Sequence, residues 1–218
     1  MSGAGAEHGF GPQHPRFPGF DVLAQQRGWD EVTRRVVLER LDPGDGPRFF
    51  TARQYATLDA VLDRLVGQEP GEAQRVRMAA MVDSRMAEGS TDGWHYEDLP
   101  RDEEVWRRSL DALEDDATGA YEASFADCSR EQQLALLTRI HDADAEERWH
   151  GMPASRLWSL WMRYACTAFY SHPAIWNEIG FSGPAYPRGY KNAHVGKREP
   201  FEVADAMPED DPRWNGAS

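Results

Sequence analysis

The chain has 218 residues, 40% of them hydrophobic, which is enough for one domain with its own core. Its formal charge is −13, from 37 acidic and 24 basic side chains, and no long basic stretch occurs. Because binding to nucleic acid or to an anionic membrane needs a basic face, this balance argues against both partners. No apolar stretch is long enough to span a bilayer and no secretory signal is visible, so we expect a cytoplasmic protein that does not insert into a membrane.

The first 66 residues predict an irregular arm and two helices. Residues 1–28 are rich in glycine and proline and predict an irregular N-terminal arm. A first helix is expected from Asp30, as its N-cap, to about Leu41, before a run of turn-forming residues. Thr51 and Gln54 form a capping box, and apolar residues follow it at spacings of three and four, which predicts a second helix to about residue 66.

The middle of the chain continues this helical pattern. A third helix is expected from about Glu72 to Ala87, with Gly89 as a left-handed cap, and a polar loop follows over 88–100. A fourth helix begins near Asp102. Beyond it, a second capping box at 129–132 opens a further helix, and four of its side chains are expected to face the core. They are Leu134, Leu137, Ile140 and His141.

The last long helix, about Pro153 to Tyr170, is apolar on nearly every side and should therefore be covered all round. A short helix can follow Pro173, and residues 181–190 combine glycine, proline and aromatics in a way that suggests a strand-like arm on an apolar surface. Because no convincing alternating strand pattern occurs, the sequence predicts an all-α fold with six or seven helices.

The predicted organisation has three parts. Residues 1–28 form the irregular arm, residues 29–190 a single compact multi-helix domain, and residues 191–218 a charged, loosely ordered C-terminal tail.

Motifs for catalysis are not found. The sequence has no phosphate-binding glycine loop, no nucleophile elbow and no haem attachment motif, and Cys128 and Cys166 suit buried or half-buried thiols. Glu147 and His150 have the spacing of one half of a di-iron site, but no second such pair exists. We therefore expect no catalytic, cofactor-binding or metal-binding residues on this chain.

Two aromatic features leave alternatives open. Trp94, His95 and Tyr96 either pin their loop to the helices or, together with the C-terminal aromatics, line a pocket for a small ligand. His172, next to a proline at a helix junction, suits a hydrogen-bonding hinge residue better than a general acid or base.

One part of the sequence resembles a known family. Residues 169–173 (FYSHP), 178–184 (EIGFSGP) and 186–187 (YP) resemble the C-terminal signature of the gluconate 2-dehydrogenase subunit 3 family. The opening of the second helix, at Phe50 and Thr51, and Asp83 in the third helix are also similar to that family. The resemblance covers about residues 48–190.

This resemblance implies a non-catalytic accessory subunit. Members of the family are small subunits of membrane-associated dehydrogenases that oxidise sugars or sugar acids. Their partner is a large FAD-containing subunit of the glucose–methanol–choline type, often with a cytochrome c subunit. The small subunit has no known redox centre and is thought to support maturation or export of the large one. Many members begin with a twin-arginine signal, which is not visible here.

The C-terminal segment is the expected partner-binding site. It concentrates aromatic rings among prolines, which supply contact area at a low entropic cost on binding. The predicted partner-binding residues are Tyr170, His172, Pro173, Trp176, Phe181, Gly183, Pro184, Tyr186, Pro187 and Tyr190. The alternative is that this segment folds back on the helices of its own chain.

Overall fold

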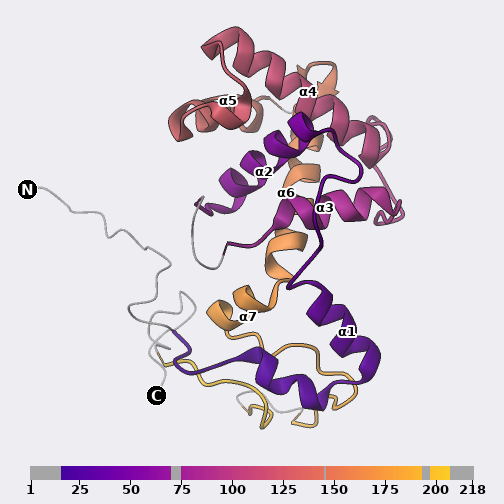
Figure 1. Ribbon diagram of the computed structural model, residues 1–218, viewed down its shortest axis with the longest axis vertical. Coiled ribbons are helices and arrows are strands. Elements are labelled where there is room, and N and C mark those ends of the chain that lie inside the picture. The colour runs from indigo at the N-terminus through magenta and orange to yellow at the C-terminus, as the bar shows by residue number, and fades with distance from the viewer. Residues whose placement is uncertain (1–15, 70–74, 145, 193–196, 207–218) are drawn as a thin grey trace, which may run out of the picture. The chain divides into compact units, whose positions relative to one another are not determined.

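The computed structural model describes residues 16–69, 75–144, 146–192 and 197–206, which form two compact units (Figure 1). One unit comprises the described residues of 39–172, and the other combines residues 16–38 with residues 173–192 and 197–206. The all-α prediction is confirmed, since the described residues form helices and a single two-stranded hairpin. The expected division at residues 28 and 190 stays a prediction, while the described residues of 16–38 and 173–206 share one unit.

The unit of residues 39–172 contains most of the long helices. Helix α6 packs against α2, α3 and α5, so it lies at the centre of this unit (Figure 1). Both predicted capping boxes are present, at the starts of α2 and α5. The elements are α2 (Ala52–Val66), α3 (Met78–Ala87), α4 (Asp102–Tyr121), the 3-10 helix η2 (Phe125–Asp127), α5 (Arg130–His141), the hairpin strands β1 (Arg148–Trp149) and β2 (Met152–Pro153), and α6 (Ala154–Tyr170).

Helix α6 is less completely covered than its composition suggests. Its buried side chains follow one broad stripe, whereas Ser155, Arg156, Ser159 and Thr167 are exposed on the other side. These polar residues therefore mark a solvent-facing side of α6 that its many aromatic residues obscure in the sequence. The buried residues are Ala154, Leu157, Leu160, Trp161, Tyr164, Ala165 and Ala168.

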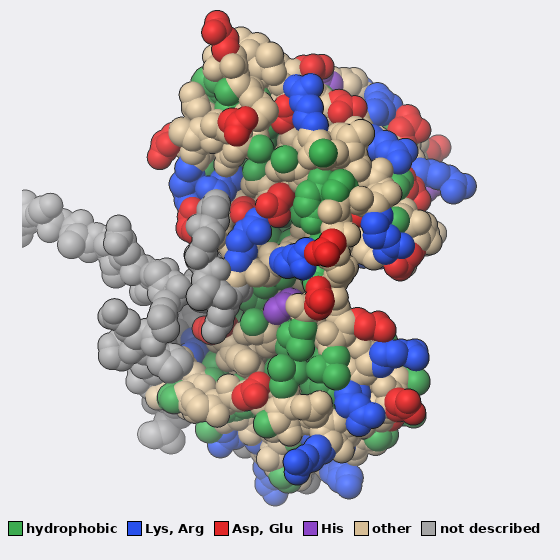
Figure 2. All heavy atoms as spheres, viewed as in Figure 1, with side chains coloured by type: hydrophobic (Ala, Val, Ile, Leu, Met, Phe, Trp, Pro, Cys, Tyr) green, Lys and Arg blue, Asp and Glu red, His purple; other side chains and the backbone are tan. Residues whose placement is uncertain are grey.

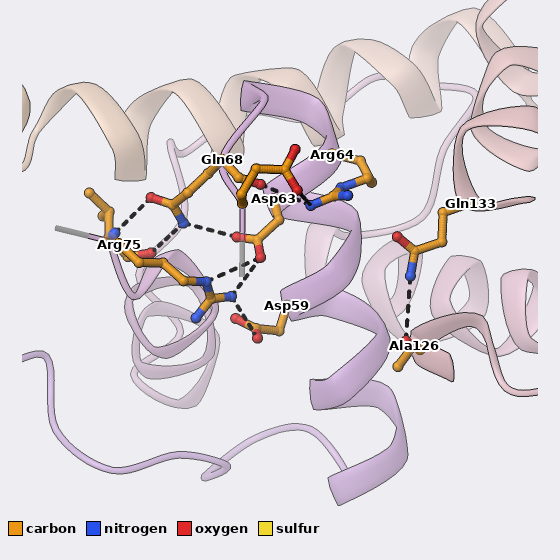
Figure 3. A network of polar contacts seen from close by, with 9 residues as sticks. Asp59, Asp63, Arg64, Gln68, Arg75, Ala126 and Gln133 are labelled. Atoms are coloured by element: carbon orange, nitrogen blue, oxygen red, sulfur yellow. Dashed lines mark hydrogen bonds and ion pairs between the residues drawn. The ribbon is translucent and has the colours of Figure 1, made fainter. Parts of the chain in front are cut away.

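Helix α3 begins at Met78, six residues later than expected, and residues 70–74 lie outside the described part of the chain. The cause is a polar network before the helix (Figure 3). The side-chain amide of Gln68 accepts a hydrogen bond from the N–H of Val76 at 2.7 Å and donates one to its carbonyl at 3.0 Å. Arg75 forms ion pairs with Asp59 and Asp63, at 2.7 and 2.8 Å. These contacts hold residues 75–76 outside a helical conformation.

Two buried carboxylates fix loops to this unit. Asp83 on α3 accepts hydrogen bonds from the backbone N–H groups of Arg48, Phe49 and Phe50, at 2.6, 3.0 and 3.0 Å. Glu114 on α4 accepts from the N–H of Phe125 at 3.1 Å and from the Thr57 hydroxyl. Both carboxylates are about 2% exposed or less, so satisfying backbone donors accounts for acidic residues inside the core.

The buried side of α5 differs from the predicted one. Leu137 and Ile140 are buried as expected, but Leu134 and His141 are exposed. Leu136 is buried instead, together with Gln133, whose side-chain amide donates to the carbonyl of Phe125 at 2.9 Å. A polar residue that bonds to a neighbouring backbone can occupy the buried face, and hydrophobic spacing does not reveal it.

The other unit brings together residues from both ends of the chain. In Figure 1 the indigo N-terminal segment runs beside the orange and yellow C-terminal segment. The first 28 residues are not wholly irregular, because Asp21 caps a 3-10 helix there. The segment expected to be a strand-like arm, residues 181–190, has irregular backbone with a turn over 186–188 and no strand pairing. The elements are η1 (Val22–Gly28), α1 (Glu31–Glu39) and α7 (Pro173–Ile179).

Candidate functional site

The predicted partner-binding residues are divided between the two units. Tyr170 and His172 belong to the helical unit of residues 39–172, and the others belong to the unit that combines the chain ends. Tyr170 is 51% exposed and its ring meets that of Phe169 edge to face. His172 is half-buried, and desolvation, followed by the charge of Arg40, lowers the pKa of its imidazole.

Trp176 lies in the core of its own unit. It is 4% exposed and shares a hydrophobic cluster with Val22, Trp29 and Val37. Next to it, the side-chain oxygen of Asn177 accepts a hydrogen bond from the N–H of Val22 at 2.8 Å. Helix α7 is therefore fixed by the N-terminal segment, and Trp176 presents little surface to a partner.

Two glycines allow this close packing. Gly183 has a φ of +76°, and a Cβ atom there would lie 2.8 Å from the Trp29 ring and 3.0 Å from Val22. Gly180 has a φ of +71°, and a Cβ atom there would clash with the ring of Phe17. Both positions combine a left-handed backbone with an aromatic ring at the Cα atom, which only glycine accepts without strain. Gly183, which is one of the predicted partner-binding residues, therefore has a packing role.

Four predicted residues in the same unit remain accessible. Phe181 is 40% exposed although its ring contacts that of Trp176, and Tyr186 and Tyr190 are 66% and 62% exposed. Pro187 is exposed beside them, while Pro173 is buried and Pro184 is half-buried. A single exposed ring is ordinary on a protein surface, whereas a group of exposed rings marks an interaction surface.

Residues distant in the chain support this segment and were not predicted. Arg188 donates to the side chain of Gln25 at 3.1 Å, and its guanidinium lies 3.8 Å from the centre of the Phe201 ring. Exposed apolar side chains also occur on α1, at Val32 and Val36. Hydrophobic side chains are visible among charged ones on the surface of this unit (Figure 2). Such contacts between distant segments have no local signature in a sequence.

A second candidate site lies beside the loop over 88–100. Trp94 is 50% exposed, and its ring meets Tyr96 edge to face at 5.3 Å. A cleft of about 280 Å³ lies here, and the C-terminal aromatics expected to share it do not line it. The lining residues are Gly89, Thr91, Gly93, Trp94, His95, Arg101, Asp102 and Glu103.

A charged network forms one side of this cleft. Asp102, 2% exposed, accepts hydrogen bonds from the Tyr164 hydroxyl at 2.7 Å and from Arg163 at 2.9 Å. The Arg163 guanidinium also lies 4.4 Å from the centre of the Trp94 ring and 3.2 Å from Asp92. Burial, and then the hydrogen bond to Asp102, raise the pKa of Tyr164. The loop is thus pinned to α6 by charge and by ring contacts.

The structure also places the other residues that the sequence analysis considered, namely Glu147, His150 and the two cysteines. Glu147 and His150 lie on the hairpin rather than on a helix, and the imidazole Nε2 of His150 is 2.8 Å from a carboxylate oxygen of Asp116. Both cysteines are free thiols, Cys128 buried and Cys166 half-buried, as predicted. Within the described ranges, no group of three or more His, Cys, Asp or Glu residues is placed to hold a metal ion. No helix in the described part of the chain is long and apolar enough to cross a membrane.

Comparison with known proteins identifies the family. The family model of gluconate 2-dehydrogenase subunit 3 matches residues 52–183, which is more than half of the chain. This match takes in α2 to α7 and ends at Gly183, inside the predicted partner-binding segment. Comparisons with curated proteins and with solved structures found no match. The chain therefore belongs to the gluconate 2-dehydrogenase subunit 3 family.

Proposed function

We propose that this chain is a non-catalytic accessory subunit of a large flavin-dependent dehydrogenase of the glucose–methanol–choline type. It binds that flavoprotein and supports its assembly, maturation or stability, and the complex oxidises a sugar, a sugar acid or a related alcohol. FAD is carried by the partner and no cofactor by this chain, and a cytochrome c subunit can complete the complex. The observation that carries the proposal is the family match over residues 52–183.

The exposed aromatics near the C-terminus supply the surface for this partner. Tyr186 and Tyr190 are more than 60% exposed, and Phe181, which lies close to them in the sequence, is 40% exposed. Tyrosine is frequent at binding hot spots, because it buries a large ring with little loss of entropy. An interface of about 1,600 Å² or more would be ordinary for a stable subunit contact. We further propose that the complex is formed in the cytoplasm.

The test is capture of the flavoprotein by the tagged full chain from its native cells. The wild-type chain should retain a large protein with a flavin absorbance spectrum. Tyr186→Ala and Tyr190→Ala should each weaken this binding by about 2 kcal/mol if the ring is a hot spot. Trp94→Ala is the matched control, because it removes an exposed ring from the other unit and should leave capture unchanged. Undiminished capture by both tyrosine variants would place the interface elsewhere.

A second candidate function rests on the cleft beside Trp94. One carboxylate oxygen of Asp102 is buried and has no hydrogen-bond partner among the described residues, and Asp102 lines this cleft. Such an oxygen favours a ligand or water that can donate a hydrogen bond. This observation supports an independent small-ligand-binding protein or enzyme. Oxidation of a sugar by the isolated chain with an artificial electron acceptor would favour this function over the accessory role.

A further inference from the structure

Four aromatic rings of the unit of residues 39–172 form an unbroken series. The ring centres of Tyr164 and Trp106 are 5.7 Å apart, edge to face, and Trp106 lies 6.3 Å from Trp161 with the planes at 24°. Trp161 then meets Trp149, on the β1–β2 hairpin, at 6.1 Å. The first three rings are at most 1% exposed, whereas Trp149 is half-buried. The series leads from the core of the unit to its surface.

The two ends of the series differ from its middle in their hydrogen-bond acceptors. The Tyr164 hydroxyl donates to the Asp102 carboxylate at 2.7 Å, and Trp149 Nε1 donates to the Asp116 carboxylate at 2.9 Å. Between them, Trp161 Nε1 donates only to the Ser109 hydroxyl, and Trp106 Nε1 has no partner among the described residues. Oxidation makes a phenol or an indole far more acidic, so that either can pass its proton to a hydrogen-bonded carboxylate. Only the two end rings can therefore lose both an electron and a proton.

We propose that these four rings relay single electrons, so that Trp149, once oxidised at the surface, is reduced again by Tyr164. A one-electron oxidant first accepts an electron from Trp149, whose indole proton passes to Asp116. One electron then moves from Tyr164 through Trp106 and Trp161 to Trp149, which takes its proton back from Asp116. The hydroxyl proton of Tyr164 passes to Asp102, and a neutral tyrosyl radical remains in the core.

The surroundings of Tyr164 require its proton to leave with the electron. The guanidinium groups of Arg85 and Arg163 lie 5.0 and 5.4 Å from the centre of its ring. Two cations so close to a buried ring oppose a positive charge on it, because the local dielectric constant is low. The Asp102 carboxylate removes that charge by taking the proton. Core packing explains why the rings are buried, and their continuous contact adds this electron path, which needs no partner protein.

Pulse radiolysis of the isolated full chain in azide solution tests the relay. Azide radicals oxidise accessible tryptophan, and the tryptophyl absorbance should then decay while the tyrosyl absorbance grows at the same first-order rate. This rate should not depend on protein concentration. Because the exposed Trp94 also contacts Tyr96, all variants are compared in a Tyr96→Phe background, where Tyr164→Phe removes only a hydroxyl group and should abolish this first-order growth. Tyr186→Phe is the control among the seven tyrosines, because Tyr186 is exposed and outside the series, and it should keep the growth.

A second pair of variants tests the path itself. In the same Tyr96→Phe background, Trp106→Phe removes the indole between Tyr164 and Trp161 and should abolish tyrosyl growth in a folded protein, as checked by circular dichroism. Trp158→Phe removes a ring that contacts Trp161 at 6.4 Å but lies off the path, and it should keep the growth. In the Tyr96→Phe background, tyrosyl growth that persists in Tyr164→Phe, or that depends on protein concentration when Tyr164 is present, would overturn the proposal. The Tyr164→Phe result decides the question even if Trp106→Phe does not fold.

Discussion

The two units of this chain are stabilised in different ways. The unit of residues 39–172 has long capped helices around α6, with buried carboxylates that bind loop backbones. The unit that joins residues 16–38 to residues 173–206 has short helices, and its cluster of Val22, Trp29, Val37 and Trp176 combines segments far apart in the sequence. The first arrangement is largely encoded locally, whereas the second depends on contacts between the chain ends.

The units also differ in the apolar surface that they expose. In the helical unit the exposed large hydrophobic residues are scattered along the sequence, at Leu41, Trp94, Leu134 and Tyr170. In the other unit they are concentrated on α1 and in residues 179–190. Under the proposed function, the helical unit is the stable scaffold and the other unit provides the surface for the partner.

The largest expected effect is in the core of the helical unit. Trp161 is fully buried, and Trp161→Ala should lower the free energy of unfolding by about 3–5 kcal/mol, because it removes a large ring and leaves a cavity. Trp94→Ala is the control, since this ring is half-exposed and its loss should cost about 1 kcal/mol or less. Urea denaturation measures both values. A cost of Trp161→Ala near that of the control would show that α6 is not the centre of the scaffold.

The next effect concerns the buried carboxylate of α3. Asp83→Ala leaves the N–H groups of residues 48–50 without their acceptor and should cost about 2–3 kcal/mol, as unsatisfied buried donors do. Asp83→Asn keeps one acceptor oxygen in place and should cost less. Chemical denaturation compares the two variants, and equal losses would mean that the hydrogen bonds are not what makes Asp83 necessary.

A smaller effect is expected where the two ends of the chain meet. Gly183→Ala should destabilise its unit by about 2 kcal/mol, from the left-handed backbone and from contact with Trp29. Gly189 has a similar φ of +70° but no atom within 4 Å of a Cβ, so Gly189→Ala should cost only the backbone share, about 1 kcal/mol. Thermal unfolding of the two variants isolates the packing contribution. No difference between them would argue against the contact between residues 29 and 183.

The smallest effect is a pH dependence at His172. Because its folded-state pKa is lowered by burial and then by Arg40, the unfolded chain binds the proton more tightly. This contribution to stability is present above the unfolded pKa of about 6.5 and is lost as the pH falls toward the folded value. His172→Gln should therefore melt with a weaker pH dependence between pH 7 and 5. An unchanged slope would show that His172 remains accessible to protons in the folded state.

Most of the helical unit could be predicted from sequence because its signals are local. The capping boxes at Thr51 and Ser129 and the left-handed Gly89 mark helix ends through side chains close in the chain. The late start of α3 could not be predicted, because Gln68 and Arg75 hold the preceding backbone through contacts across several residues.

The candidate site was only partly predictable for the same reason. The aromatic character of residues 176–190 is visible in the sequence, but burial of Trp176 depends on Trp29, nearly 150 residues away in the chain. Exposure of Tyr186 and burial of Trp176 therefore cannot be told apart by composition, since both are large rings in a segment rich in proline and glycine.

Hydrogen–deuterium exchange of the full chain, free and in the captured flavoprotein complex, tests the division of roles most directly. We predict that amide exchange slows on complex formation over residues 181–190, while α2 and α6 exchange at the same rates in both states. Slower exchange confined to residues 39–172, or no change anywhere in residues 181–190, would contradict the account.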